Sequence, residues 1–305
     1  MKLVVLDGNS INPGDLSWEA LAVMGELSIW PSSSQEEALA RAVGAEAVFV
    51  DSHSLPRAAL EQMSALRFIG ILATGYDNVD TEAAAELGIA VTNVPAYSTE
   101  AVSQHAIALL LELTNKVGIH NEEVQKGKWF DSHGITFCHM PLTVLAGKSM
   151  GIVGYGNIGK RVGEIAKALG MTVYVYSREP EAAVRADVIS LHCPVTDKTA
   201  GLVNREFISR MKDGAFLINT ARGGLLEEDA VAEALRSGKL TGAAVDVLAE
   251  EPPRREAKSP LLGLPNCLVT PHMAYMPRET RQRICDIAAD NLKSFLAGGD
   301  RNRIV

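Results

Sequence analysis

The segment from Lys148 to Arg178 constrains the fold of this chain more than any other part of its sequence. It is predicted to contain an apolar strand (residues 149–153), a glycine turn (154–159), an amphipathic helix (158–169) and a second strand (171–176). Two strands joined through one helix form a βαβ unit, in which the strands are parallel and the helix covers one face of the sheet. The sequence therefore predicts a parallel α/β fold.

Three glycines of this unit fill the positions of a G-x-G-x-x-G motif. Gly154 permits a tight turn, Gly156 lets the backbone approach a pyrophosphate, and Gly159 lets the helix pack close to the sheet. The helix directs its first amides, at Asn157 and Ile158, and its positive dipole end toward the turn, where an anion is stabilised. Because a strand precedes the motif and a helix follows it, we predict a dinucleotide site rather than a merely structural turn.

The end of the second strand indicates which dinucleotide binds. An NAD site usually places Asp or Glu there to accept hydrogen bonds from the ribose hydroxyls, whereas this chain has Ser177 and Arg178. A hydroxyl and a guanidinium suit an adenosine 2′-phosphate, which favours NADP(H). If Arg178 is instead an ordinary solvated arginine, NAD(H) or both cofactors would serve.

Composition is typical of a globular chain with two domains. The 305 residues are many for one hydrophobic core, and 47% of them are hydrophobic against 22% charged. The formal charge of −8, without a run of like charge, disfavours nucleic acid as a partner. No stretch reaches the length of a membrane span, and the apolar part of the N-terminus MKLVVLDGN is too short for a signal peptide.

Four cysteines are scattered along the chain without a C-x-x-C pair, at Cys138, Cys193, Cys267 and Cys285. They are interpreted as reduced thiols that pack as small buried residues in a cytoplasmic protein. His133 and His139 are separated by six positions and lack thiol or acidic companions, so no metal site is predicted.

The first hundred residues alternate short apolar strands with helices, which predicts a second parallel sheet with helices on both faces. Ligands bind such sheets beyond the carboxyl ends of the strands, here residues 51–54, 73–78 and 93–97. Thr74 and Gly75 offer a hydroxyl and an open backbone amide, which would form a nest for a small carboxylate. A plain turn, with Asp77 or Asp80 capping the next helix, fits the same loop equally well.

A long helix is predicted from Ser98 or Thr99 to Lys116, with apolar residues on more than one face, as in a helix buried between domains or subunits. His105 lies within this helix and is interpreted as packed and hydrogen-bonded rather than catalytic. The pattern is irregular over residues 121–147.

Three motifs beyond the glycine turn give the chain a family resemblance. NTARGG at residues 219–224, AVDVLAEEP at residues 244–252 and TPHMA at residues 270–274 follow the turn in that order. Together they closely resemble the D-isomer-specific 2-hydroxyacid dehydrogenases. NVPAYSTEAVSQHA, at residues 93–106, is most similar to the glycerate dehydrogenase and hydroxypyruvate or glyoxylate reductase branch.

The resemblance implies two doubly wound parallel-sheet domains, with a Rossmann nucleotide-binding domain inserted into a flavodoxin-like substrate domain. The expected boundaries are residues 1–98 plus 278–305 for the substrate domain and residues 99–277 for the dinucleotide-binding domain. It also implies a homodimer formed through the helix after Thr99.

Three catalytic residues follow from the matched motifs: Arg222, Glu251 and His272. An arginine can bind the α-carboxylate of a substrate while polarising its carbonyl, a histidine can donate the proton that a new alkoxide needs, and a glutamate can orient the imidazole. The hydride would come from the nicotinamide. Taken singly, each residue also has an ordinary structural interpretation, in a salt bridge, a solvated loop or a turn.

By the same resemblance, the cofactor should also contact Cys193, Pro194, Thr199, Thr220, Ala221 and Asp246, the last through the nicotinamide amide. Thr74 and Gly75 should receive the substrate carboxylate together with Arg222, and His53 should line the same pocket.

The predicted activity is reduction of a small 2-oxo acid, such as glyoxylate or hydroxypyruvate, to the D-2-hydroxy acid. The alternative is a nicotinamide-sensing binding protein without turnover, similar to the corepressors built on this fold. Formate dehydrogenase-like chemistry is a third interpretation, which is weakened because Glu251 stands where that group is expected to use glutamine.

One connection departs from the family pattern. Only residues 179–185 join the strand before Ser177 to the next strand, where family members usually carry a longer, partly helical segment. Either the loop is abbreviated or residues are missing from the sequence, and the prediction of NADP(H) depends on this wall of the adenosine pocket.

Overall fold

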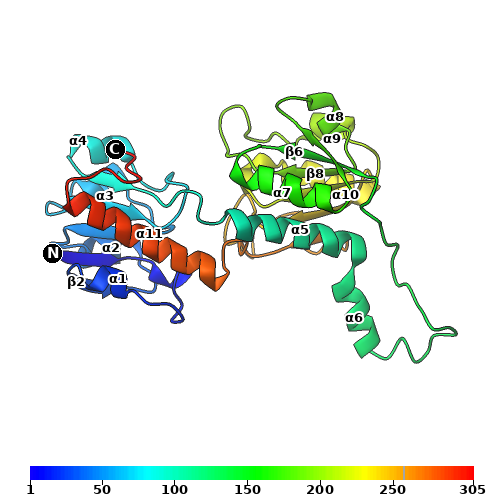
Figure 1. Cartoon of the computed structure of the whole chain (residues 1–305), viewed down its shortest axis with the longest axis horizontal. Coiled ribbons are helices and arrows are strands. Elements are labelled where there is room, and N and C mark those ends of the chain that lie inside the picture. Colours follow the sequence, from blue (N-terminus) through cyan, green and yellow to red (C-terminus); the bar gives the residue numbers. More distant parts are fainter. Residues whose placement is uncertain (257) are drawn as a thin grey trace. The chain divides into compact units, whose positions relative to one another are not determined.

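The protein consists of two compact α/β units. A computed structural model describes residues 1–256 and 258–305, and it divides into Met1–Ser98 with Tyr275–Val305, and Thr99–Ala274 (Figure 1). The chain re-enters the first unit at Tyr275, whereas the sequence had suggested residue 278. The reason is that Tyr275 packs against the core of the first unit, where its hydroxyl donates to the Ser10 carbonyl (3.4 Å).

The first unit is built on a five-stranded parallel sheet with the order β2-β1-β3-β4-β5. Its strands are β1 (Lys2–Val5), β2 (Glu26–Ile29), β3 (Ala47–Val50), β4 (Phe68–Ile71) and β5 (Ala90–Thr92). This is the flavodoxin-like order, so the fold expected for the substrate domain is confirmed.

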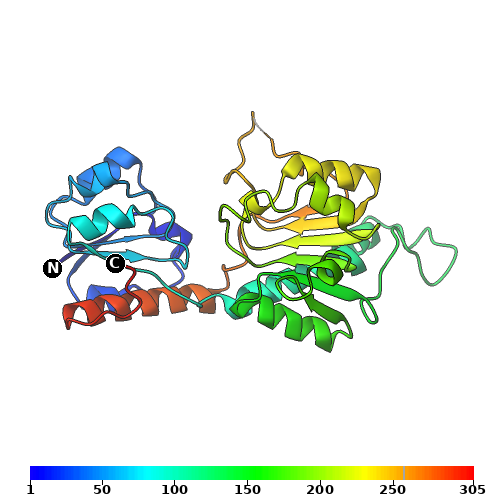
Figure 2. The same ribbon diagram turned by 90° about the horizontal axis from the view of Figure 1, so that it is seen from above.

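Successive side chains of each strand point to opposite faces of this sheet, and each face has its own core. Val4 and Val48 pack on one face and Leu3 and Phe49 on the other. The first face is covered by α2 (Gln35–Arg41), α3 (Arg57–Leu60) and α4 (Thr81–Glu86), and the second by α1 (Glu19–Ala22) and α11 (Arg278–Leu296) (Figure 2).

The second unit has a six-stranded parallel sheet with the order β11-β10-β9-β8-β6-β7. Its strands are β6 (Ser149–Val153), β7 (Thr172–Val175), β8 (Val188–Leu191), β9 (Ala215–Asn219), β10 (Leu240–Val245) and β11 (Cys267–Val269). α5 (Thr99–Asn115) and α7 (Asn157–Ala168) cover one face, and α8 (Pro180–Val184), α9 (Arg205–Arg210) and α10 (Glu228–Ser237) cover the other. Short 3₁₀ turns occupy Gly8–Ser10 in the first unit and Gly223–Leu225 in the second.

The short connection after β7 folds as the five-residue helix α8. α8 lies so close to β6 that a Cβ on Gly151 would come within 2.1 Å of the Ala183 carbonyl oxygen. The chain then continues into β8, on the other side of β6, and leaves β7 at the edge of the sheet. Rossmann sheets commonly have a further strand beyond this one. The carboxyl ends of β6 and β8 form the topological switch point, where such sheets bind ligands.

The region after α5 is partly helical, although the sequence indicated an irregular pattern from residue 121. Lys116 adopts a φ of 51°, which ends α5, and α6 (Val117–Gln125) follows. Residues 126–148 then have no regular secondary structure, and the middle of this segment projects from the second unit before Leu145 packs into its core (Figure 1). Cys138 is exposed there, so the expectation that every cysteine is buried is wrong for this residue. None of the described helices is long and apolar enough to cross a membrane.

Candidate active site

The glycine motif lies at the carboxyl end of β6 and leads into α7. Gly154 has a φ of 93°, and a Cβ on Gly159 would lie 2.0 Å from the Gly154 carbonyl oxygen. Gly156 has no atom within 4 Å of the position of a Cβ, and it is the N-cap of α7 without any side-chain cap. The first turn of α7, with Asn157 and Ile158, therefore begins at an open backbone turn, which is the arrangement that binds phosphate groups.

Neighbouring strand ends bring further polar groups to this edge of the sheet. Leu191 at the end of β8 pairs with Val153 at the end of β6, so His192 follows directly beside the glycine turn. Among the described residues, the buried Nδ1 of His192 and the buried Oγ1 of Thr220 have no hydrogen-bond partner. An unpaired buried polar atom is costly, so a further polar partner would be favourable at each of these two atoms.

Burial also determines the charge of the groups that follow β8. It lowers the pKa of His192 to about 4 and raises the pKa of the Cys193 thiol. The Nε2 of His192 shares a hydrogen bond with the Ser190 hydroxyl (2.8 Å). Both side chains are therefore uncharged near neutral pH, and this strand end adds no charge to the glycine turn.

Ser177 and Arg178 are exposed directly after β7. The Arg178 Cζ lies 5.5 Å from the ring centroid of Tyr155, which stands between the first two glycines of the motif. A cation–π contact at an exposed site contributes about 0.5–1 kcal/mol and here holds the guanidinium beside the glycine turn. Sequence reasoning gave Tyr155 no role, although an aromatic residue within a glycine motif could have suggested one.

Thr199 uses its hydroxyl within its own loop. The Oγ1 donates to the Pro194 carbonyl (2.7 Å) and accepts from the Thr196 amide (2.8 Å). The loop after Cys193 is shaped by these two bonds, and the contact of Thr199 with a cofactor stays a prediction.

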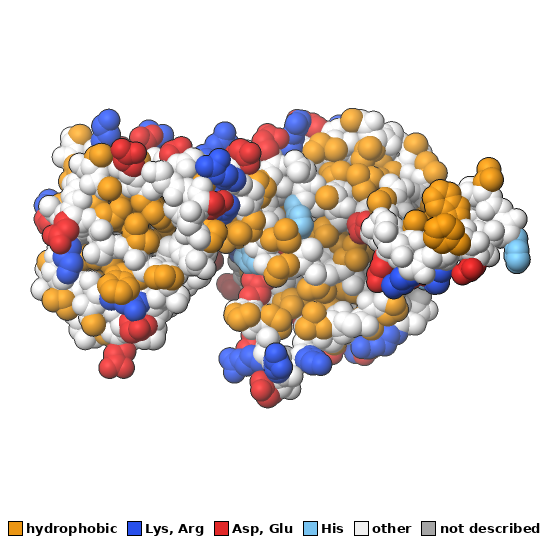
Figure 3. All heavy atoms as spheres, turned by 90° about the horizontal axis from the view of Figure 1, so that it is seen from below, with side chains coloured by type: hydrophobic (Ala, Val, Ile, Leu, Met, Phe, Trp, Pro, Cys, Tyr) orange, Lys and Arg blue, Asp and Glu red, His pale blue; other side chains and the backbone are white. Residues whose placement is uncertain are grey.

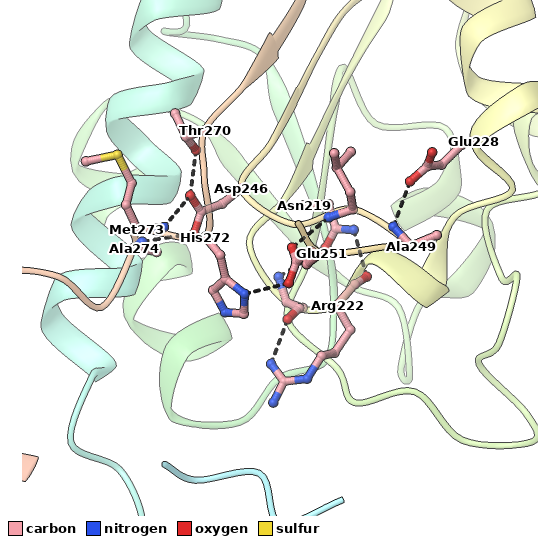
Figure 4. A network of polar contacts seen from close by, with 12 residues as sticks. Asn219, Arg222, Glu228, Asp246, Ala249, Glu251, Thr270, His272, Met273 and Ala274 are labelled. Atoms are coloured by element: carbon pink, nitrogen blue, oxygen red, sulfur yellow. Dashed lines mark hydrogen bonds and ion pairs between the residues drawn. The ribbon is translucent and has the colours of Figure 1, made fainter. Parts of the chain in front are cut away.

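His272 and Glu251 lie side by side in the second unit (Figure 4). Glu251 Oε2 is 2.8 Å from His272 Nδ1, and Glu251 Oε1 accepts a hydrogen bond from the Leu248 amide (2.8 Å). The hydrogen bond to Glu251 raises the pKa of His272, as do the charges of Glu251 and Asp246, while burial and the charge of Arg222 oppose the shift. The pair therefore stabilises a protonated imidazole whose orientation is held from the Nδ1 side.

Arg222 follows β9 in the same part of the unit (Figure 4). Asn219, buried at the end of β9, donates from Nδ2 to the Arg222 carbonyl (2.9 Å) and accepts from the Ala221 amide (3.0 Å). The Arg222 side chain is exposed, and its Nη1 donates to the Ala221 carbonyl (2.8 Å). Asn219 had no predicted role, although asparagine before a sharp turn often binds the backbone in this way.

Asp246 is 1% exposed and its carboxylate is surrounded by donors. It accepts hydrogen bonds from the Thr270 hydroxyl (2.6 Å) and from the backbone amides of Met273 and Ala274 (both 2.9 Å) (Figure 4). The interpretation of His105 as a hydrogen-bonded residue is confirmed, because its Nε2 lies 3.1 Å from Thr270 Oγ1. Asp246 thus organises the loop that carries His272, and its contact with a nicotinamide amide stays a prediction.

The remaining predicted residues lie in the first unit, after β3 and β4. Asp7 accepts hydrogen bonds from the backbone amides of residues 51–53 (2.8, 2.7 and 2.8 Å), and Asn78 donates to the His53 carbonyl (2.9 Å). The loop that carries His53 is therefore held by two side chains. Within the described part of the chain, the buried Nε2 of His53 has no hydrogen-bond partner.

The loop after β4 matches the capping interpretation. Asp80 caps α4 by accepting from the Ala83 amide (2.8 Å), and Thr74 donates from its hydroxyl to the Val94 carbonyl (2.9 Å). The carboxylate nest at Thr74 and Gly75 stays a prediction. In residues 1–256 and 258–305, no group of three or more His, Cys, Asp or Glu side chains could hold a metal ion.

Comparison with known proteins identifies the family. A model described as "D-isomer specific 2-hydroxyacid dehydrogenase, NAD binding domain" matches residues 107–274, more than half of the chain. The match includes the glycine turn and the Arg222, Glu251 and His272 positions. The chain belongs to this dehydrogenase family.

Individual proteins of known sequence or structure also match the chain over its whole length. The hydroxypyruvate reductase of Blautia hydrogenotrophica is 43% identical over 320 residues, which cover 99% of each chain. The TT0316 protein of Thermus thermophilus has a TM-score of 0.88 with 33% identity over 100% of both chains. An acyclic imino acid reductase, solved with NADPH and D-Arg, has a TM-score of 0.85 with 27% identity over 100% of both chains.

The chain is therefore an enzyme, a 2-hydroxyacid oxidoreductase of the hydroxypyruvate reductase and glycerate dehydrogenase branch. These matches give no support to a corepressor-like binding protein.

Proposed function

We propose that this enzyme reduces a small 2-oxo acid, such as glyoxylate or hydroxypyruvate, to the D-2-hydroxy acid. The observation that carries the proposal is the 2.8 Å contact between His272 Nδ1 and Glu251 Oε2, close enough to Arg222 for its charge to act on the imidazole. Carbonyl reduction needs a proton donor at the new alkoxide, and a histidine with a raised pKa supplies one near neutral pH. The name of the 43% identical relative, hydroxypyruvate reductase, supports this class of substrate.

Each side chain of the set has a separate role in this proposal. Arg222 binds the α-carboxylate through its fork of N–H groups and polarises the neighbouring carbonyl. His272 donates its proton from Nε2, the ring nitrogen opposite the one that contacts Glu251. Glu251 keeps the ring oriented and stabilises its charged form. In the first unit, Thr74, Gly75 and His53 are proposed to bind the substrate.

The residues at the switch point of the second unit suit a nicotinamide cofactor. The open turn at Gly154, Gly156 and Gly159 suits the pyrophosphate, and the unpartnered His192 Nδ1 and Thr220 Oγ1 suit polar groups of the same ligand. Such a cofactor, when bound, supplies the hydride. The other residues proposed to contact it are Asn157, Ile158, Ser177, Arg178, Cys193, Pro194, Thr199, Ala221 and Asp246.

The activity is tested by following NADPH and NADH oxidation with a panel of 2-oxo acids that includes glyoxylate, hydroxypyruvate and pyruvate. We expect turnover with at least the two-carbon or three-carbon acids. His272→Gln should lower kcat by about 10²–10⁴-fold, the usual contribution of a general acid, while cofactor binding measured by fluorescence is retained. Absence of turnover with every acid in the panel would refute the proposal.

We further propose a preference for NADP(H). Tyr155 holds Arg178 beside the glycine turn, and none of the first three residues after β7 carries a carboxylate. The measurement is the ratio of kcat/KM for NADPH to that for NADH. Arg178→Ala should lower this ratio by about tenfold, as expected for loss of one charge-assisted phosphate contact. Arg185→Ala removes another exposed arginine, directly after α8, and is the matched control. An unchanged ratio in Arg178→Ala would contradict the assignment.

We also propose a cytoplasmic homodimer. The sequence placed the subunit contact on α5, but Leu109, Leu110 and Leu113 of α5 pack within the second unit. Better support comes from the segment after α6, where Phe130 and Ile135 are 93% and 89% exposed and hydrophobic side chains gather on the surface (Figure 3). Light scattering of Phe130→Asp should show a monomer if this segment forms the contact, and a wild-type monomer would refute the homodimer.

A further inference from the structure

The carboxylate of Asp246 is the centre of a buried hydrogen-bond network around the proposed proton donor. Its oxygens bind the Thr270 hydroxyl (2.6 Å) and the amides of Met273 and Ala274 (both 2.9 Å), as Figure 4 shows. The backbone carbonyl of Asp246 accepts from the His272 amide (2.7 Å). This one residue therefore binds the Thr270 side chain before His272 and the backbone amides at and after His272.

The backbone at His272 needs such support. His272 has a φ of 50°, in the left-handed region that residues with a side chain adopt only at a cost in energy. Such a conformation persists only where its surroundings hold it, and here the surrounding contacts include the hydrogen bonds from the His272, Met273 and Ala274 amides to Asp246. The position of Asp246 thus sets the direction in which the imidazole of His272 leaves the backbone.

His105 joins this network from α5. Its Nε2 lies 3.1 Å from Thr270 Oγ1 and 3.3 Å from Asp246 Oδ1. The Thr270 hydroxyl gives its own proton to Asp246, so its oxygen acts as the acceptor toward His105. The Nε2 of His105 must therefore carry a proton, which it directs toward both oxygens.

We propose that His105 is a positioning residue for the reaction. By donating from Nε2, it holds Thr270 and Asp246 in the arrangement that presents the His272 imidazole to Glu251 and to the substrate. The inference rests on the proposed role of His272 as the proton donor. It implies that loss of the donor on α5 displaces the His272 ring through Thr270 and Asp246.

Two variants at residue 105 separate donation from packing. His105→Leu removes the N–H donor and leaves a side chain of similar size. His105→Gln replaces the imidazole but still offers an N–H donor on a side chain that can reach the same oxygens. Gln104→Leu changes an exposed neighbour on the same helix and is the matched control. The charged groups that act on His272, which are Glu251, Asp246 and Arg222, are the same in all three proteins.

Two measurements on the full chain report how these substitutions affect catalysis and the His272 ring. Steady-state kinetics with hydroxypyruvate and NADPH give kcat and KM, and ¹⁵N-resolved NMR of the imidazoles reports the His272 ring directly. For His105→Leu we expect kcat to fall by about 10- to 100-fold, the loss caused by displacing a catalytic group by about 1 Å, with a smaller change in KM. The His272 ring signals should move in the same variant. His105→Gln should recover most of the loss, and Gln104→Leu should match the wild type.

Two outcomes would overturn the inference. One is His105→Leu with a kcat close to that of the wild type and unmoved His272 signals. The other is equal impairment of His105→Gln and His105→Leu together with a lower Tm, which would show that the residue only packs. If His105→Leu does not fold, Thr270→Val removes the hydroxyl between His105 and Asp246 and should move the same signals. A wild type without turnover would instead refute the proposed function, and the NMR measurement would still decide the role of His105.

Discussion

Replacing Glu251 by glutamine is the sharpest test of the proton donor, because it removes one charge and almost no volume. The glutamine carbonyl oxygen can still accept from the Leu248 amide, as Glu251 Oε1 does at 2.8 Å. Its NH₂ group then faces His272 Nδ1, where the carboxylate oxygen lay at 2.8 Å. A protonated imidazole cannot donate to an NH₂ group, so the charged form of His272 loses its partner.

The size of the effect follows from the exposure of the pair. Hydrogen bonds to charged groups contribute about 1.5–3 kcal/mol. The His272 side chain is 45% exposed and that of Glu251 is 34% exposed, so solvent screens the contact and the lower end of the range applies. A loss of about 1.4 kcal/mol corresponds to about tenfold in rate under conditions where protonation of His272 limits the reaction.

The assay is the rate of hydroxypyruvate reduction as a function of pH, with saturating cofactor. Glu251 raises the pKa of His272 in the folded enzyme, so the wild-type rate should be constant below that pKa and fall as pH rises through it. In Glu251→Gln the fall should begin at lower pH, and the loss of rate should grow from acid toward alkaline conditions. Glu250→Gln is the matched control, because Glu250 is the exposed neighbour that pairs with Arg254.

The result that would refute this reasoning is a Glu251→Gln profile that coincides with the wild type. A loss of equal size at every pH would also contradict it, because that pattern would assign Glu251 to folding or positioning and not to the protonation of His272.

Two further predictions concern the second unit. Burial lowers the pKa of His192 from 6.5 to about 4 in the folded protein. As pH falls through this range, the unfolded chain therefore binds a proton before the folded chain does. The free energy of unfolding should drop by up to about 3 kcal/mol. His192→Gln should reduce that drop in urea unfolding, and wild-type and variant curves with the same pH dependence would contradict the assignment. Gly159→Ala should weaken NADPH binding and lower stability by about 1–3 kcal/mol, because its Cβ would lie 2.0 Å from the Gly154 carbonyl oxygen. Gly163→Ala on the same helix meets the movable Ile152 side chain at 3.1 Å and should change NADPH affinity far less, so equal losses would contradict the packing argument.

The parallel sheets were predictable from sequence because their signals are local. Short apolar runs at β6 and β7, the glycine turn between them and the helix that follows all fall within one stretch of the chain. The edge position of β7 was not predictable in the same way. It depends on the close contact of α8 with Gly151, which brings the chain back across β6 after only five helical residues.

The limits of local patterns also appear on α5. Its apolar residues suggested a helix buried between domains or subunits, and several of them pack within the second unit, while a contact with a second chain stays a prediction. A helix with apolar residues on more than one face looks the same in sequence whether its second face meets a sheet or another chain. The packing of α5 against β9 and β10 is visible only in the tertiary structure.

The sequence by itself determined the class of fold, and it predicted a cofactor turn and the Arg222, Glu251 and His272 set, because each rests on short motifs with characteristic residue types. Tertiary structure alone decided how His272 is held. Asp246 and Thr270 directly follow β10 and β11, His105 lies on α5, and their hydrogen bonds form only when that helix is docked on the sheet. A hydrogen bond between residues 105 and 270 leaves no periodic or compositional trace in the chain, since its geometry exists only in the folded state.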